Sequence, residues 1–263
     1  MLPDIFKIGP LTLHSYGLML ALAFLAGIWL MELQAKKYGL DKTLIVDFGV
    51  LVMAGSVIGS RLMYITTHWS DYSSNLLQAL AVWEGGLTFY GGFILGTLTA
   101  VAYCRVRKIS FWTIADIAAP GFALGLGLGR IGCFLNGCCF GKPSQLPWAV
   151  HFPANGAASL AAGCPVHPTQ LYEAAFGFAA FGLLWSLRNK NKFPGFSSCL
   201  FFLFYGIWRF IVDYFRFYEQ SQRWTFGLTN NQWISLGIIL FAIGAGLVLK
   251  LRHDTGASSR EKR

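Results

Sequence analysis

The chain alternates between long apolar segments and short polar ones. Seven of the apolar segments are each about long enough to cross a hydrocarbon core of roughly 30 Å, which takes about 20 helical residues. They run over residues 14–33, 44–64, 87–104, 112–130, 170–187, 196–218 and 232–251. The pattern therefore predicts an all-α integral membrane protein with about seven transmembrane helices.

The composition favours a bilayer as the solvent. Of the 263 residues, 55% are hydrophobic and only 13% are charged, which is outside the usual balance of a soluble domain. The first apolar run begins at Leu11 and continues for a full span, so we expect a retained helix and no cleavable signal peptide. Because no internal repeat is visible, residues 1–263 are expected to form a single membrane-embedded domain, with 252–263 as a polar cytoplasmic tail.

The basic residues predict the orientation in the membrane. Lys and Arg are retained in short cytoplasmic loops, and most of the 21 in this chain fall on the same side. That side holds Lys36, Lys37, Lys42, Arg105, Arg107, Lys108, Arg188, Lys190, Lys192, Lys250, Arg252, Arg260, Lys262 and Arg263. The N-terminus is therefore expected outside and the C-terminus in the cytoplasm. The net charge of +9 is divided among these loops and lacks the continuous basic stripe of a nucleic-acid-binding surface.

Charged residues within a span cost at least a few kcal/mol unless they are paired or wetted. Asp47 and Asp116 lie near the inner ends of the second and fourth spans, where a solvated or helix-capping role is expected. The other polar residues converge on the outer half of the spans. They are His14, Tyr16, Arg61, Tyr64, Tyr90, Arg130, His167, Gln170, Tyr172, Glu173, Tyr205, Arg209, Asp213 and Arg216.

The sixth span carries four of these polar residues. Tyr205, Arg209, Asp213 and Arg216 follow one another at intervals of 4, 4 and 3 residues. This spacing predicts that they share one face of a helix, where Asp213 can pair with either arginine. A purely structural Arg-Asp-Arg triad is an equal alternative from this span alone.

Four arginines are predicted at similar depth on three spans, with two acidic partners. The arginines are Arg61, Arg130, Arg209 and Arg216, and the acids are Glu173 and Asp213. This balance predicts a positive pocket. Guanidinium groups present a planar donor fork that suits phosphate, and the phosphate most available at that depth belongs to a phospholipid headgroup. We therefore expect Arg130 to hold a lipid phosphate.

Glycines and cysteines gather around Arg130. Gly121, Gly125, Gly127, Gly129, Gly132, Gly137 and Gly141 are too dense for a stable straight helix and predict tight packing followed by an irregular segment. The spacing of Cys133, Cys138, Cys139 and Cys164 lacks the paired ligands of a zinc site. A disulfide from Cys164 to Cys138 or Cys139 is the preferred hypothesis if the outer compartment is oxidising. Cys104 and Cys199 are predicted to be small packing residues.

Residues 129–141, GRIGCFLNGCCFG, resemble the signature segment of the prolipoprotein diacylglyceryl transferase family. The resemblance extends over nearly the whole chain. Its further blocks are LHSYGL at 13–18, SRLMY at 60–64, EGGLTFYGG at 84–92, ADIAAP at 115–120, HPTQLYE at 167–173 and YGIWRFIVDYFR at 205–216. Several blocks in family order make the resemblance specific.

The resemblance implies a seven-helix enzyme of the bacterial inner membrane with its active site toward the periplasm. Such an enzyme moves the diacylglyceryl group of phosphatidylglycerol to the thiol of a lipobox cysteine in a prolipoprotein, the first step of lipoprotein maturation. Neither a metal nor an organic cofactor is implied. The implied functional residues are Tyr16, Arg130, Asn136, Gly141, Tyr205 and Arg209, with Glu173, Asp213 and Arg216 as supports.

The residue that removes the thiol proton is left open by the sequence. Some members carry a histidine where this chain has Tyr90, and a tyrosine of pKa about 10 is a poor base near pH 7 unless cations lower its pKa. His14 and His167 are the alternatives. Cys133 and Cys138 stand where other members often carry asparagine and glutamate, so no role is transferred to those two positions.

Two other functions compete with this interpretation. A lipid scramblase or anion transporter without catalysis would place ionisable residues through the full thickness of the membrane, whereas here they stop near mid-depth. A phospholipid transferase with a different acceptor differs from it only in that acceptor. The expected partners are phosphatidylglycerol, lipobox peptides and membrane lipid, and the sequence leaves the oligomeric state open.

Overall fold

The computed structural model describes residues 4–8, 11–72, 85–153, 163–217 and 225–261. The chain divides into two compact units. The first comprises Met1–Leu30 and Ala115–Arg263, and the second comprises Met31–Ile114. The boundaries fall within helices α1 (Ser15–Ala35) and α5 (Phe111–Asn136). Each unit is described separately below.

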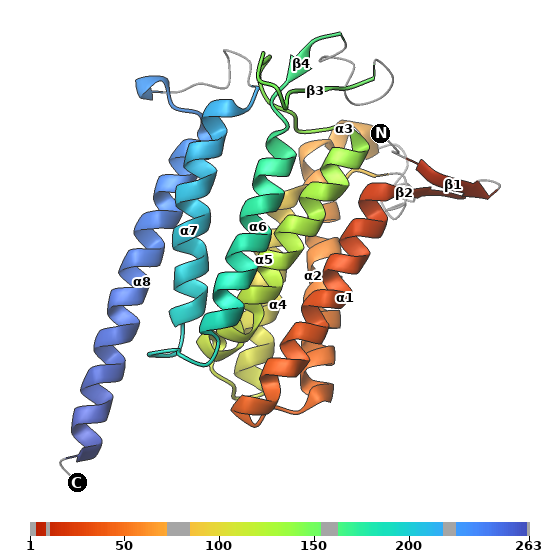
Figure 1. Ribbon diagram of the computed structural model, residues 1–263. Helices are drawn as coiled ribbons and strands as arrows, with labels where there is room; N and C mark the ends of the chain where they lie inside the picture. Colours follow the sequence, from red (N-terminus) through yellow and green to blue (C-terminus); the bar gives the residue numbers. More distant parts are fainter. Residues whose placement is uncertain (1–3, 9–10, 73–84, 154–162, 218–224, 262–263) are drawn as a thin grey trace. The chain divides into compact units, whose positions relative to one another are not determined.

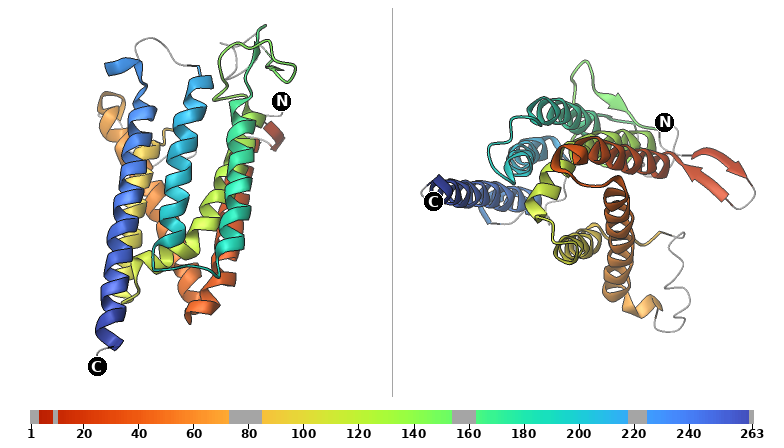
Figure 2. Two further views of the ribbon diagram at one scale, coloured as in Figure 1. Left: turned by 60° about the vertical axis from the view of Figure 1, so that its left-hand side comes forward. Right: turned by 90° about the horizontal axis from the view of Figure 1, so that it is seen from below.

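The second unit is built around helices α2 (Lys42–Thr67) and α4 (Phe89–Val106), which lie side by side (Figure 2). A short helix, α3 (Trp69–Tyr72), follows α2. Gly59 and Gly91 bring the two long helices together, since a Cβ on either would collide with the backbone carbonyl of the other. The Tyr103 hydroxyl donates a hydrogen bond to the Leu44 carbonyl at 3.0 Å and ties the end of α4 to the start of α2.

The first unit contains most of α5, together with α6 (Thr169–Leu187), α7 (Phe196–Val212) and α8 (Asn230–Glu261) (Figure 1). Its core is formed by small and apolar residues of α5, α6 and α7. These are Ala119, Ala123, Ala180, Leu184 and Phe201. Two hairpins complete the unit. One pairs β1 (Asp4–Ile8) with β2 (Leu11–His14), and the other pairs β3 (Val150–His151) with β4 (Pro165–Val166). Neither hairpin was predicted from the apolar pattern.

The prediction of an all-α integral membrane protein is confirmed. Within the described residues, six helices are long and apolar enough to cross a membrane, and they coincide with six of the seven predicted windows. The fifth window forms α6, which is not among the six. Large apolar side chains project outward from the helices, among them Leu25, Phe122, Leu240 and Leu247. An apolar exterior around small buried residues is the arrangement that a lipid environment favours.

Helix α5 shows the tight packing followed by an irregular segment that its glycines predict, although the glycines do not prevent a continuous helix. The helix continues to Asn136, six residues beyond the predicted window, and only then becomes irregular. Its glycines lie against neighbouring helices: a Cβ on Gly177 of α6 would lie 2.6 Å from the backbone nitrogen of Gly127. Close helix packing compensates for the low helix propensity of glycine.

Asp47 and Asp116 have the solvated and helix-capping roles expected of them. Asp116 on α5 is buried and caps the start of α7, accepting hydrogen bonds from the backbone nitrogens of Gly195 at 2.7 Å and Ser198 at 2.9 Å. Asp47 lies at the surface and pairs with Arg107 at 3.5 Å. Asp116 thus satisfies N–H groups that the first turn of a helix cannot pair internally.

Candidate active site

Glu173, in the second turn of α6, is the centre of the site. Its carboxylate forms ion pairs with three arginines, Arg130 at 2.7 Å, Arg209 at 3.3 Å and Arg216 at 3.3 Å. We refer to Arg130, Arg209 and Arg216 as the arginine cluster. Two of the arginines share the Oε1 atom, and Arg130 contacts Oε2. The site therefore joins three helical regions through one carboxylate.

Two residues of the arginine cluster come from the ends of helices. Arg130 lies near the end of α5, and Arg209 lies in the last turn of α7. Asp213 follows α7 and pairs with Arg209 at 3.3 Å, while the Thr229 hydroxyl donates a short hydrogen bond to its other oxygen. The Asp213 carboxylate therefore holds Arg209 in addition to Glu173.

The predicted face of the sixth span is only partly correct. Helix α7 ends at Val212 and a 3-10 turn covers Asp213–Phe215, so Arg216 has left the helix and its backbone is extended. Arg209 and Asp213 pair as the spacing predicts, but Arg216 reaches Glu173 on α6. The helix terminates earlier than its apolar pattern because the chain turns to meet the segment around Gly141.

Three arginines and two acids meet in these ion pairs, and the predicted positive pocket of four arginines stays a prediction. The side chains of Glu173 and Asp213 are only 2% and 0% exposed, whereas those of the arginine cluster are 11–18% exposed. The carboxylates are therefore more deeply buried than the guanidiniums that contact them. Among the ion pairs of the described residues, three guanidiniums meet two carboxylates, and a guanidinium carries more N–H donors than one carboxylate can accept. Such an arrangement can bind an anion that approaches from the exposed side.

The segment after α5 is held against the start of α6. The Gln170 amide donates to the Cys138 carbonyl at 2.7 Å, and the Thr169 hydroxyl donates to the Cys139 carbonyl at 2.9 Å. The Gly141 nitrogen donates to the His167 carbonyl at 2.9 Å. The blocks GRIGCFLNGCCFG and HPTQLYE thus form one structural unit. The sequence analysis placed Gln170 among the outer polar residues without predicting this role.

Gly141 lies where no other residue fits. A Cβ at this position would lie 2.5 Å from the Phe215 carbonyl oxygen, 2.7 Å from the His167 Cβ and 2.8 Å from the Thr169 Cγ2. Its backbone forms an antiparallel bridge with Arg216. Gly141 therefore lets the signature segment approach the chain that carries one arginine of the cluster.

The other predicted residues of this unit lie on the surrounding elements. Tyr16, in the first turn of α1, packs against Gly132, whose added Cβ would lie 3.2 Å from the tyrosine ring. Asn136 is the last residue of α5, and Tyr205 stacks on Phe201 within α7. His14 is exposed and is the last residue of strand β2. Tyr16 and Asn136 thus flank the turn of α5 that follows Arg130.

Arg61 and Tyr90 belong to the second unit. Arg61 is buried, donates hydrogen bonds to the carbonyls of Gly85 at 2.8 Å and Gly86 at 3.3 Å, and lies over the ring of Tyr72. It therefore secures the turn that leads into α4. Tyr90 is exposed in the first turn of α4. Their predicted convergence with the arginine cluster stays a prediction.

His167 lies directly before α6, and its Nδ1 is 3.3 Å from the Tyr172 hydroxyl. Burial of the ring, and then the positive charge of Lys142, lower the pKa of His167 below its ordinary value. The imidazole is therefore neutral near pH 7 and has an unprotonated nitrogen. This is the state that a general base needs.

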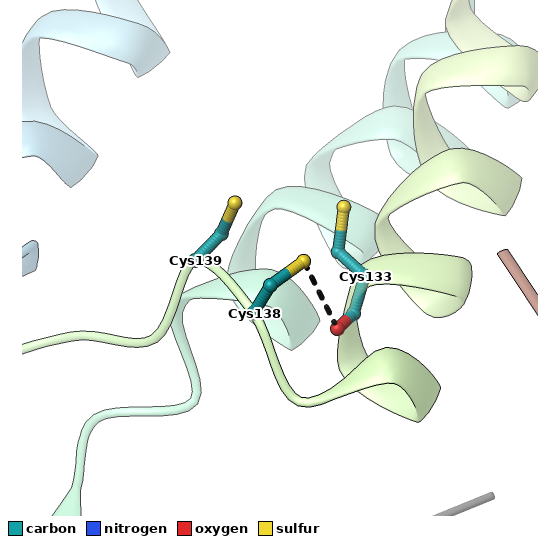
Figure 3. A group of neighbouring side chains, drawn as sticks. All are labelled: Cys133, Cys138 and Cys139. Atoms are coloured by element: carbon teal, nitrogen blue, oxygen red, sulfur yellow. Dashed lines mark hydrogen bonds between the residues drawn. The ribbon is translucent and has the colours of Figure 1, made fainter. Parts of the chain in front are cut away.

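The cysteines correct the disulfide hypothesis. All six are free thiols, and the sulfurs of Cys133, Cys138 and Cys139 lie within 4.8 Å of one another, without Cys164 (Figure 3). The Cys138 thiol donates to the Cys133 carbonyl at 3.7 Å. Hydrogen bonds with the other two thiols, and then the charges of Arg216 and Arg130, lower the pKa of Cys139. The linear spacing hid this cluster because the chain folds back after α5.

Comparison with known proteins gives consistent results over most of the chain. Residues 3–248 match the family model described as prolipoprotein diacylglyceryl transferase. A phosphatidylglycerol–prolipoprotein diacylglyceryl transferase of Bordetella avium (strain 197N) is 37% identical over 255 residues, covering 92% of this chain and 94% of the relative.

Two further relatives carry the same name. The protein of Synechococcus sp. (strain CC9902) is 38% identical over 218 residues, covering 80% of this chain and 78% of its own. That of Geobacter sulfurreducens is 38% identical over 218 residues, covering 81% of this chain and 82% of its own. The range that matches the family model, residues 3–248, spans the positions of the arginine cluster and of both sequence blocks around it.

Proposed function

Because the chain belongs to the prolipoprotein diacylglyceryl transferase family and transfers a diacylglyceryl group from phosphatidylglycerol to prolipoproteins, we propose that its arginine cluster binds the phosphate of the lipid donor. The observation that carries this proposal is the ion-pair arrangement around Glu173. One buried carboxylate orients three guanidiniums, and their side chains are 11–18% exposed. Planar donor forks held in this way match phosphate oxygens.

The reaction requires positive charge where the phosphate leaves. The thiol of the lipobox cysteine loses its proton, its sulfur forms a bond to the glycerol carbon, and the bond from that carbon to the phosphate oxygen breaks. Glycerol phosphate departs with the bonding electrons and gains negative charge. Guanidiniums that are already oriented stabilise this transition state more than they stabilise the bound lipid. Arg130 and Arg209 are assigned this role.

The remaining predicted residues orient the reactants. Tyr16 and Asn136 flank the turn after Arg130, and Tyr205 lies one turn before Arg209, so all three can contact the headgroup. We assign the removal of the thiol proton to His167, Tyr90 or His14, and His167 has the most suitable protonation state. The other predicted contributors to lipid binding are Gly141, Arg216, Arg61 and Glu173.

The proposed cellular setting follows from the charge distribution. The protein is a multi-pass membrane protein, and its basic loops favour an orientation with the C-terminus in the cytoplasm. The arginine cluster then faces the periplasmic side of the bacterial inner membrane. Phosphatidylglycerol of the outer leaflet and the lipobox of a secreted prolipoprotein meet at that side.

The decisive experiment measures transfer directly. The purified full-length chain is incubated with phosphatidylglycerol and a lipobox peptide, and mass spectrometry detects the diacylglyceryl adduct on the peptide cysteine. Arg130→Ala and Arg209→Ala are each expected to lower kcat by about 10²–10³-fold, the usual cost of removing one oriented donor. Arg107→Ala, which removes a half-exposed guanidinium directly after α4 in the second unit, is the matched control. Near-wild-type transfer by the Arg130 variant would refute the assignment.

A further inference from the structure

Three cysteine thiols meet where helix α5 gives way to the signature segment. Cys133 lies on the last turns of α5, and Cys138 and Cys139 lie on the segment that follows (Figure 3). We propose that Cys133, Cys138 and Cys139 form a binding site for one thiophilic cation of the Zn²⁺ class, which we call the three-cysteine site. Sulfur ligands select zinc and copper(I) over harder cations such as Mg²⁺ and Ca²⁺.

The sulfur positions suit such a cation. Each pair of sulfurs lies within 4.8 Å. At the centre of a triangle with sides of that length, a cation would lie about 2.8 Å from each sulfur, and a Zn–S bond is about 2.3 Å long. A contraction of about 0.5 Å per sulfur therefore completes the site, which side-chain rotation can supply. Three protein ligands leave one tetrahedral position for water or another ligand.

The backbone holds the three thiols in place without help from a cation. Cys139 adopts a φ of 64°, in the left-handed region that residues with a side chain seldom occupy. Hydrogen bonds from Gln170 and Thr169 hold the carbonyls of Cys138 and Cys139. Residues kept in such a conformation by their surroundings are typical of functional sites. The thiols are thus preorganised, which reduces the cost of gathering ligands.

The charges around the three-cysteine site favour the form that holds a cation. Three thiolates and one divalent cation carry a net charge of −1. Arg130 and Arg216 supply opposite charge, since both interact electrostatically with Cys139. An anionic metal–thiolate centre beside the positive arginine cluster is therefore compensated. The site is also close enough to that cluster for a bound cation to influence it.

The test measures cation binding and does not depend on transfer activity. The full-length chain, purified in detergent and kept reduced with a phosphine, is titrated with Co²⁺ and separately dialysed against Zn²⁺. We expect the absorption bands of tetrahedral cobalt–thiolate coordination and one Zn²⁺ per chain. Cys138→Ser and Cys139→Ser should each weaken binding by at least about 100-fold, since losing even an outer-shell partner costs 10–100-fold. Cys164→Ser and Cys199→Ser are the matched controls and should bind as the wild type does.

A second measurement uses the unaltered chain, so it does not depend on whether a variant folds. Zn²⁺ should protect Cys133, Cys138 and Cys139 from alkylation and leave the exposed Cys164 reactive, as peptide mapping can resolve. Labelling of the three cysteines that is unchanged by Zn²⁺ would overturn the proposal. So would binding that both control variants lose to the same extent. Transfer activity measured in the same preparation tests the lipid-binding proposal separately.

Discussion

Glu173 explains at the level of single residues why the site uses arginine. Its two carboxylate oxygens contact three guanidiniums, and each guanidinium presents donors in several directions from one plane. One donor of each arginine can therefore face the carboxylate while others face a phosphate. A lysine has a single charged atom and cannot provide this geometry with the same precision.

The first prediction tests this geometric argument. Arg130→Lys keeps the positive charge and removes the donor fork, so we expect transfer to fall on the order of 10²-fold, as for the loss of an oriented donor. The measurement is kcat for adduct formation on a lipobox peptide. If Arg130→Lys retained full activity while Arg130→Ala did not, charge alone would suffice and the fork would be irrelevant.

The second prediction concerns the protonation of His167. Because its pKa is lowered, the imidazole is neutral above its folded pKa, which lies below about 6.5, and becomes charged as the pH falls through that value. If His167 removes the thiol proton, kcat/KM rises with pH through an apparent pKa below 6.5. Lys142→Gln removes a charge that lowers this pKa, so the rise should move to higher pH.

Two variants separate His167 from the other candidates for this role. His167→Gln should abolish the acidic limb of the kcat/KM profile, whereas Tyr90→Phe should leave that limb in place. The opposite pattern would assign the proton transfer to Tyr90. A profile that neither variant changes would direct attention to His14.

Contacts between the ends of α5, α6 and α7 determine where the arginine cluster forms. Helices α5 and α7 each end with an arginine in or near the last turns, and α6 begins with the carboxylate that binds them. The segment after α5 is held by the start of α6 and by the chain that follows α7. The positions of the site residues therefore depend on the contact between the segment after α5, the start of α6 and the chain after α7. Gly141 allows these three segments to approach closely.

The third prediction tests that junction. Gly141→Ala forces a methyl group against the Phe215 carbonyl and the His167 side chain, so we expect lower thermal stability and a large loss of transfer. Gly182→Ala on helix α6 is the matched control, because a Cβ at this position would meet no other atom within 4 Å. Helix propensity predicts that this control is neutral or stabilised by up to about 1 kcal/mol. The midpoint of thermal unfolding in detergent measures both, and equal behaviour of the two variants would contradict the steric argument.

The apolar segments of the sequence predicted the positions of the long helices well and the positions of their ends less well. Every predicted window contains a helix, because helix-forming apolar runs of this length have few alternatives in lipid. The ends of α5 and α7 differ from prediction, since packing against neighbours extends α5 and the turn toward Gly141 shortens α7. The two hairpins escaped prediction because their strands are only two to five residues long.

At the scale of the whole molecule, the exterior of the helices is apolar and their contacts are made by small residues. Gly59 with Gly91 in one unit, and Gly127 with Gly177 in the other, allow backbones to touch. Large apolar side chains then remain on the outside. In lipid this distribution is stable because helix association depends on close packing rather than on burial of apolar surface.

The fourth prediction concerns orientation. The basic loops predict a cytoplasmic C-terminus, so a green fluorescent protein fused after residue 263 should fluoresce and an alkaline phosphatase fused there should be inactive. Activity of the phosphatase fusion would reverse the topology and place the arginine cluster on the cytoplasmic side. Expression of both fusions is checked by immunoblot.

The sequence by itself determined the membrane class, most helix positions, the family and the excess of arginine over acid. These properties depend on composition, spacing and local pattern, which are all visible along one chain. Only the tertiary structure decided that Arg216 binds Glu173, that Gln170 and Thr169 hold the signature segment, and that three cysteines meet without Cys164. Such contacts arise where a helix ends and the chain folds back, and side-chain periodicity carries no information beyond that point.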